Sequence, residues 1–261
     1  MPATKSSIET VTFPIDIQDR LLRIVEDHAV DISMKTTHYI PNVMNSYRDG
    51  KANIPRPEKP SLARLSLGRK GQKFKITRLN ATYQEKTADW IEELGQRAGG
   101  YKRTATITLL LLDWFQINPF PDVFDLKPGA LAKKNETISS TTSMTDRLRG
   151  ALTCQKRLLR LLERAGDPMP LQQYMRAILA SYARGEIRAL RPPEGSVPAL
   201  KPSRAGKDFP NQNLSVYFSP DLLQWIDELG IRAAGLNRSH VMLLLFLDWL
   251  HVSPFAEICT V

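Results

Sequence analysis

An internal duplication constrains the fold of this chain more than any other feature of its sequence. The segment that begins at Trp90, WIEELGQRAGGYKRTATITLLLLDWFQINPF, aligns without a gap on the segment that begins at Trp225, WIDELGIRAAGLNRSHVMLLLFLDWLHVSPF. About half of the aligned positions are identical, far more than chance would give, so the two segments descend from one unit. The fold must therefore contain the same substructure twice.

The duplication also extends upstream of these segments. RLLRIVEDHAVDISMKTTHYIPNVMNSYRDG, which begins at Arg20, matches RLLRLLERAGDPMPLQQYMRAILASYARG, which begins at Arg157, with a length difference of two residues. The repeated unit is therefore about 100 residues long. Each copy has the pattern of a helical pair, a basic proline-rich connector and a second helical pair.

These patterns predict two modules, each made of two units. The first module covers 8–120, an inter-module linker covers 121–142, and the second module covers 143–255. The prolines of the connectors, and their lack of an apolar period, favour extended linkers. The predicted units and linkers are 8–50, 51–73 and 74–120 in the first module, and 143–185, 186–208 and 209–255 in the second.

The last unit gives the clearest local signals. An apolar and a polar set alternate with period two, as in a half-buried strand: Leu214, Val216 and Phe218 against Asn213, Ser215 and Tyr217. Ser219 followed by Pro220 predicts the start of a helix, and Gly235 predicts its end. Either Asn237 or Ser239 then caps a second helix.

That second helix, which contains VMLLLFLDWL, is apolar on almost every side. A unit of about 45 residues is too small to bury such a helix alone. Each unit must therefore pair with another.

A strand, two helices, a Gly-x-Asn/Ser-Arg-Ser/Thr turn and an obligate partner together resemble the ribbon-helix-helix family of DNA-binding proteins. The resemblance is best over 213–249 and 77–114. In the second of these, Leu79, Ala81 and Tyr83 should face inward, opposite to Arg78, Asn80 and Thr82. The resemblance implies a mainly α fold with short β-ribbons, in which four such units form two single-chain pseudo-dimers.

The first and third units follow the pattern less closely. In the first, Val11, Phe13 and Ile15 form the inner face of the strand, and Asp16 should cap a helix over 17–28. A second helix should run from a cap at Ser33 to Tyr47, kinked or shortened by Pro41. In the third, Leu148 and Leu152 should face inward around Gly150, and helices should cover about 154–165 and 170–183.

In the family that this chain resembles, paired strands enter the DNA major groove and their outward side chains contact bases. Arg78 would then donate to guanine O6 and N7, and Asn80 would bridge adenine N6 and N7. An ordinary solvated strand face is the alternative for each position. The candidate base-contacting residues are Thr10, Thr12, Arg78, Asn80, Thr82, Arg147, Arg149, Asn213, Ser215 and Tyr217.

Phosphate contacts are expected at the N-terminus of each second helix, where free amides and a partial positive charge suit an anion. Capping is the alternative role, and Thr104 and Ser239 are placed to perform it. The candidates are Lys102, Arg103, Thr104, Asn237, Arg238 and Ser239. Cations of the first linker are further candidates for contact with the DNA backbone, although a solvated linker explains them equally: Lys51, Arg56, Lys59, Arg64, Arg69, Lys70, Lys73 and Lys75.

Composition agrees with a polyanionic partner and gives no support for catalysis. Lys and Arg outnumber Asp and Glu by 36 to 27, a formal charge of +9. Cys154 and Cys259 are far apart, and the histidines lack ligand spacing, so neither a disulfide nor a metal site is expected. No catalytic motif appears, and Asp113 and Asp248 are interpreted as surface or capping positions. The polar N-terminus and the short apolar runs favour a cytoplasmic protein without membrane contact or cofactor.

The pairing of units through a long basic linker is similar to the arrangement in T-DNA border-binding accessory virulence proteins of type IV secretion. That resemblance implies an accessory role in plasmid conjugation, as part of a relaxosome that binds double-stranded DNA beside a relaxase. A transcriptional repressor or antitoxin-like regulator of the same fold is the first alternative. A protein-interaction scaffold that does not bind DNA is the second.

Overall fold

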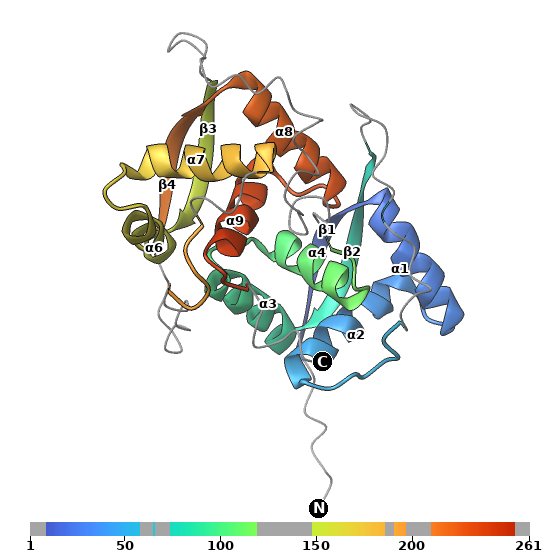
Figure 1. Cartoon of the computed structure of the whole chain (residues 1–261). Coiled ribbons are helices and arrows are strands. Elements are labelled where there is room, and N and C mark those ends of the chain that lie inside the picture. Colours follow the sequence, from blue (N-terminus) through green and yellow to red (C-terminus); the bar gives the residue numbers. More distant parts are fainter. Residues whose placement is uncertain are drawn as a thin grey trace, which may run out of the picture.

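The computed structural model describes residues 9–57, 65, 74–118, 148–185, 191–196 and 210–253. The described part is mainly helical, with two short antiparallel sheets of two strands each (Figure 1). A strand followed by two helices occurs four times along the chain. The elements are β1 (Thr10–Gln18), α1 (Asp19–Asp31) and α2 (Thr36–Asp49); β2 (Ile76–Gln84), α3 (Glu85–Arg97) and α4 (Arg103–Trp114); β3 (Leu148–Gln155), α6 (Lys156–Gly166) and α7 (Leu171–Arg184); β4 (Asn211–Phe218), α8 (Pro220–Arg232) and α9 (Arg238–Trp249).

The four strands pair in twos, as the family resemblance implied. β1 pairs with β2 to form the first ribbon, in which Asp16 lies opposite Arg78. β3 pairs with β4 to form the second ribbon, in which Thr153 lies opposite Asn213. Each ribbon therefore joins the two units of one module through backbone hydrogen bonds between their strands.

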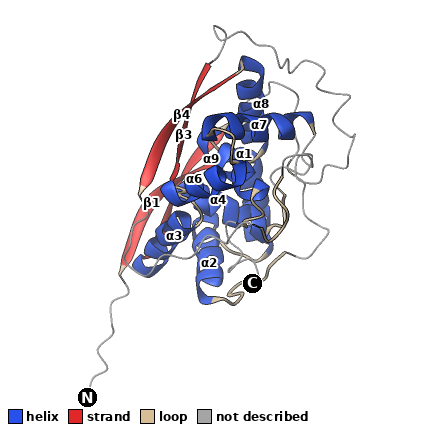
Figure 2. Ribbon diagram, turned by 60° about the vertical axis from the view of Figure 1, so that its left-hand side comes forward, coloured by secondary structure: helices blue, strands red, loops and turns tan. Residues whose placement is uncertain are grey.

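Both ribbons lie on one side of the molecule, and the helices lie behind them (Figure 2). The inner strand side chains are buried against the helices, and they include Ile15, Ala81, Tyr83, Leu152 and Val216. The outer side chains alternate with them and face away from the core. One side of the molecule is therefore a strand surface, which we call the ribbon face.

Several predicted boundaries in the first unit are wrong. Asp16 is a strand residue and not a cap, because the alternation continues through the fully buried Ile17 and α1 begins at Asp19. Ser33 adopts a positive φ of 56° before α2, whose N-cap is Lys35. Pro41 does not shorten α2, which has 14 residues like its equivalent α7. Pro41 and its neighbours are buried, so packing outweighs the loss of one backbone hydrogen bond.

The third unit also differs from its prediction in detail. Strand pairing continues through Cys154, which is buried, so α6 begins only at Lys156. Leu148 was predicted to face inward, but it is 52% exposed. It is the first residue of β3 and lies opposite Phe218, the last residue of β4, so it sits at the very end of the ribbon.

The helix signals of the fourth unit are confirmed. Ser219 is the N-cap of α8, and its side chain accepts a hydrogen bond from the backbone N–H of Leu222. Asn237, and not Ser239, caps α9 by accepting from the backbone N–H of His240 at 3.0 Å. Between the helices, Gly235 has a φ of 88°, a conformation that glycine adopts without strain.

The last helix of each module, α4 or α9, is held by the same pair of side-chain hydrogen bonds. The indole Nε1 of Trp114 donates to the hydroxyl of Tyr39 at 2.9 Å, and Trp249 donates to Tyr174 at the same distance. Next to these tryptophans, Tyr47 donates to Asp113 and Tyr182 donates to Asp248. The two aspartates therefore have a structural role in the end of the helix.

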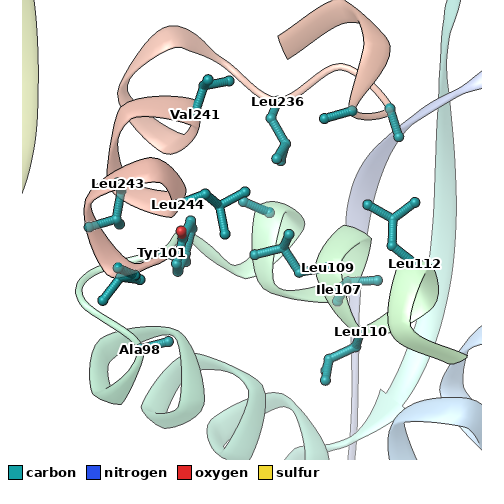
Figure 3. Packing of buried hydrophobic residues seen from close by; sticks show 14 of the residues in the cluster. Ala98, Tyr101, Ile107, Leu109, Leu110, Leu112, Leu236, Val241, Leu243 and Leu244 are labelled. Carbon is teal, nitrogen blue, oxygen red and sulfur yellow. The ribbon is translucent and has the colours of Figure 1, made fainter. Parts of the chain in front are cut away.

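The helices that are apolar on all sides, α4 and α9, bury their remaining faces against the other module. Figure 3 shows Leu109 of α4 and Leu244 of α9 pointing toward each other between the two helices. Residues from both modules belong to one continuous hydrophobic core. Pairing within a module was predicted, whereas this second level of packing is a finding of the structure.

Candidate nucleic-acid interface

The outer face of the first ribbon is polar and exposed. Thr12 and Thr82 lie opposite each other, and their hydroxyl oxygens are 2.8 Å apart in a hydrogen bond. Asn80 is exposed opposite Pro14. Thr10 is exposed at the end of the ribbon. The alternation predicted for this ribbon is therefore confirmed, and the structure brings its candidate residues onto one surface.

Arg78 is held in place by a carboxylate on the same surface. Its Nε donates to Asp16 Oδ1 at 2.8 Å and its Nη2 donates to Asp16 Oδ2 at 3.1 Å, a two-pronged contact between exposed side chains. The hydrogen bond from Arg78 lowers the pKa of Asp16 below its ordinary value. Asp16 was not predicted to lie on this surface, although it continues the period-two alternation of β1. Arg78 is thus an oriented group on the ribbon face.

The outer face of the second ribbon has different chemistry. Arg149 lies opposite Tyr217, and its Nε donates to the hydroxyl of Ser215 at 2.8 Å. The hydroxyl of Thr153 donates to Asn213 Oδ1 at 2.7 Å. The described residues of this face include no carboxylate. Arg147, the remaining strand candidate, lies outside the described residues.

The N-termini of α4 and α9 lie beside the ribbons. Ser239, in the first turn of α9, accepts a hydrogen bond from the backbone N–H of Thr153 in β3 at 3.0 Å. The guanidinium of Arg103, at the start of α4, lies 4.7 Å from the ring centroid of Phe13 in β1. The N-cap of α4 is the exposed Lys102, without a side-chain cap, so Thr104 does not perform the capping role considered for it.

Both arginines at these helix starts are paired with a carboxylate of the preceding helix. Arg238 donates to Asp227 through Nε at 2.8 Å and Nη2 at 2.6 Å. Arg103 pairs with Glu92, which aligns with Asp227 in the repeat. The side chains remain partly exposed. The pairing was not predicted, because the acids lie eleven residues before the arginines and have no local signal of their own.

One linker cation proposed for backbone contacts has a structural role instead. Arg56 Nη2 donates to the backbone carbonyl of Asp113 at 2.9 Å and to its carboxylate at 3.1 Å, so it closes the C-terminal end of α4. Arg191 makes the equivalent contacts with Asp248. Lys51 and Lys75 are exposed. The other linker candidates, Lys59, Arg64, Arg69, Lys70 and Lys73, lie outside the described residues.

Two further observations concern other classes of site. Within the described ranges, no three His, Cys, Asp or Glu side chains gather as ligands of a metal ion would. None of the helices in these ranges has the length and apolar character needed to cross a bilayer. Comparison of the chain with protein-family models, with curated proteins and with solved structures finds no significant match.

Proposed function

We propose that this protein is a non-enzymatic, sequence-selective binder of double-stranded DNA, built from four ribbon-helix-helix units. The observation that supports this most strongly is the ribbon face: two antiparallel two-stranded ribbons lie on one side of the molecule with polar outer surfaces (Figure 2). The major groove is about 12 Å wide and admits a two-stranded ribbon. The outward side chains of the ribbons would contact base edges in the major groove.

The outward side chains supply the donors and acceptors that base edges require. Arg78 would donate to guanine O6 and N7, and Asn80 would bridge adenine N6 and N7. On the second ribbon, Arg149 would take the guanine role, with Ser215 and Asn213 as adaptable partners. Arg78 and Arg149 each donate a hydrogen bond to a neighbouring side chain, which orients the guanidinium in the absence of DNA.

Phosphate contacts would come from the starts of α4 and α9. Lys102 and Asn237 are exposed there, beside amides that α-helices leave without internal partners. Arg103 and Arg238 would exchange their carboxylate partners in part for phosphate oxygens. The formal charge of +9 favours approach to a polyanion in general.

In biological role, we place the protein among accessory factors of conjugal or T-DNA-type transfer, with a relaxase as a neighbouring partner. The support is the arrangement of two units paired through a basic connector, here present in both halves. A repressor of the same fold would share the DNA chemistry and differ in the location of its target. A footprint over a transfer origin and over the region upstream of the protein's own coding sequence separates the two roles.

A salt titration tests DNA binding itself. The full chain is titrated with a random-sequence duplex at several salt concentrations, and the logarithm of affinity should fall linearly with that of salt, by about 0.9 per neutralised phosphate. Replacing both Arg103 and Arg238 with alanine should weaken binding to all duplexes and reduce that slope by about 1 per lost contact. The control is Arg23→Ala, which removes an exposed cation of α1. Weak binding that does not respond to salt would instead support the protein-interaction scaffold.

A further inference from the structure

The two modules are joined by a pair of side chains that close the end of a helix in the other module. Gln18 Nε2 donates to the backbone carbonyl of Ile231 at 2.9 Å, and Arg20 Nη2 donates to the same carbonyl at 2.6 Å and to that of Arg232 at 3.3 Å. These carbonyls belong to the C-terminal end of α8, where a helix lacks internal donors and favours a cation. Gln18 in turn accepts from Arg20 Nε at 2.9 Å, so the pair acts as one group.

The equivalent side chains of the second module donate to backbone carbonyls at the end of a helix in the first module. Arg157 Nη2 donates to the backbone carbonyl of Gln96 at 3.1 Å and also to that of Arg97, at the end of α3. Gln155 donates to the carbonyl of Gln96 and accepts from Arg157 Nε at 2.7 Å. Gln155 and Arg157 align with Gln18 and Arg20 in the repeat, so the junction has the reciprocal form of a two-fold interface.

Close packing surrounds these contacts. Tyr101, which is almost fully buried, packs against the ring of His240 with their centroids 5.4 Å apart and their planes tilted by 44°. A Cβ added at Gly100 would lie 3.2 Å from Asn211 Oδ1 of the other module, and one at Gly99 would lie 3.3 Å from Leu243 Cδ1. Burial lowers the pKa of both Arg20 and Arg157 to about 10. The junction is therefore a packed interface and not a flexible hinge.

This junction fixes the position of one ribbon relative to the other. Gln18 and Ile76 form the end of the first ribbon that lies at the junction, since both are close to Gly235 of the second module. Gln155 and Asn211 form the corresponding end of the second ribbon, close to Gly100 of the first. Both ribbons lie on the same side of the molecule (Figure 2). A duplex laid over this side would meet both ribbons of one chain.

The backbone repeats across the junction, but the chemistry of the ribbon face does not. Aligned position by position, the first ribbon presents these cross-strand pairs: Thr12 with Thr82, Pro14 with Asn80, and Asp16 with Arg78. In the same order, the second ribbon presents Arg149 with Tyr217, Ala151 with Ser215, and Thr153 with Asn213. The arginine lies at opposite ends of these two series, and only the first series contains a carboxylate. The outer surfaces of the two ribbons therefore differ in chemistry, although their backbones repeat.

We propose that one chain recognises a single directional, two-part duplex site: two unlike half-sites, read on one side of the DNA at a spacing that the junction fixes. This inference rests on the proposed DNA-binding function. A symmetric assembly of identical ribbons would select a palindrome, because each half would read the same bases. Here the first ribbon selects for guanine through Arg78, with Asp16 as an acceptor for cytosine N4, while the second combines Arg149 with the ring of Tyr217.

The test begins with selection of duplexes from a randomised pool by the full-length chain. The expected product is two dissimilar sequence blocks at constant spacing and in constant relative orientation. Insertion of five base pairs between the blocks turns one of them to the opposite side of the helix, and inversion of one block reverses its reading direction. Each change should lower affinity by about tenfold or more.

Several results would overturn the proposal. They are two identical blocks, a single block, or blocks whose spacing or orientation varies freely in the selected pool. The proposed function fails in a different way, with no enriched sequence and salt-independent binding. The selection and the salt titration together therefore distinguish the two failures.

Matched variants assign each block to its ribbon. Asn80→Ala and Ser215→Ala alter equivalent positions of the two ribbons, and each should relax base preference in one block only. Loss of preference in both blocks from one substitution would contradict the assignment.

The role of the junction is tested by the double variant Gln18→Ala with Arg20→Ala, and by its counterpart Gln155→Ala with Arg157→Ala. Each should reduce the loss of affinity that the five-base-pair insertion causes, because polar contacts that fix the junction are removed while its apolar packing remains. Both block preferences should be retained, and an unchanged loss of affinity in a folded variant would contradict the role assigned to these side chains. Far-ultraviolet circular dichroism shows whether each variant is folded. If both variants unfold, the insertion test on the unaltered chain decides, since it needs no substitution.

Discussion

At the scale of single residues, the ribbon face is defined by how polar side chains hold one another. Arg78 is held by Asp16 and Arg149 by Ser215, so both arginines in the described part of the face have defined directions. The contact between Arg78 and Asp16 is exposed, so its contribution to folding stability is small. Its importance lies in orientation and in the sign of the local charge.

Asp16→Asn tests that interpretation. Under the proposed function the ribbon face approaches DNA phosphates, so removal of this carboxylate should strengthen binding to random duplexes by about fivefold at low salt, with the gain shrinking as salt rises. Preference for guanine in the first block should fall, because Arg78 is then less firmly oriented. Asp31→Asn removes an exposed acid at the end of α1 and should leave both quantities unchanged. Weaker binding of random duplexes by the Asp16 variant would contradict this view of the face.

At the scale of elements, the connection from the first to the second helix of a unit determines how the helices meet. Gly95 lies inside α3, and a Cβ added there would lie 2.4 Å from the backbone carbonyl oxygen of Tyr101. Gly230 in α8 is equally close to the carbonyl of Leu236, at 2.2 Å. In both copies the second helix can return across the first only because this position has no side chain.

Gly95→Ala should therefore destabilise the protein, although alanine normally favours a helix over glycine by about 1 kcal/mol. The backbone of Tyr101 must move to accept the methyl group, which we expect to cost about 1–3 kcal/mol in the free energy of unfolding. Urea denaturation measures the change. Gly50→Ala is the control, because nothing lies within 4 Å of an added Cβ there and only its positive φ of 63° opposes the substitution. A stabilised Gly95 variant would show that the close approach is not maintained in solution.

At the scale of the whole molecule, the junction makes the stability of the protein depend on pH through one histidine. His240 lies against the ring of Tyr101, where burial, followed by the charge of Lys102, lowers the pKa of its imidazole to about 4. In the unfolded chain the same group titrates near pH 6.5, at its ordinary pKa of about 6.5. Below that pH the unfolded state binds a proton that the folded state does not.

The consequence is a loss of stability in acid with a defined window. Stability linked to His240 should be complete above about pH 6.5, should fall as the pH drops toward 4, and should change no further below 4, with a total of a few kcal/mol at most. Thermal unfolding at a series of pH values measures this loss. His240→Gln should remove most of the dependence between pH 6.5 and 4. An equal dependence in that variant would assign the effect to other groups.

Some features of this protein follow from the sequence alone, because they depend on neighbours a few positions apart. The alternation around Leu79 and Leu214 predicts two of the strands and their outward faces, and Ser219 with Pro220 predicts a helix start. The gapless match from Trp90 and Trp225 predicts the repeated architecture. The strand and helix signals lie within a few neighbouring residues. The repeat becomes visible when the sequence is aligned with itself.

Other features were decided only by tertiary structure. Asp16 became a surface acid because cross-strand pairing with β2 continued past the point where a helix was predicted. Arg56 of the linker donates to a backbone carbonyl at the end of α4. Gln18 and Arg20 donate to a carbonyl at the end of α8, more than 200 residues away in the chain. Such contacts join groups whose separation in the chain leaves no periodic trace. They form only when packed helices bring unsatisfied carbonyls and buried donors together, because a buried polar group must find a partner.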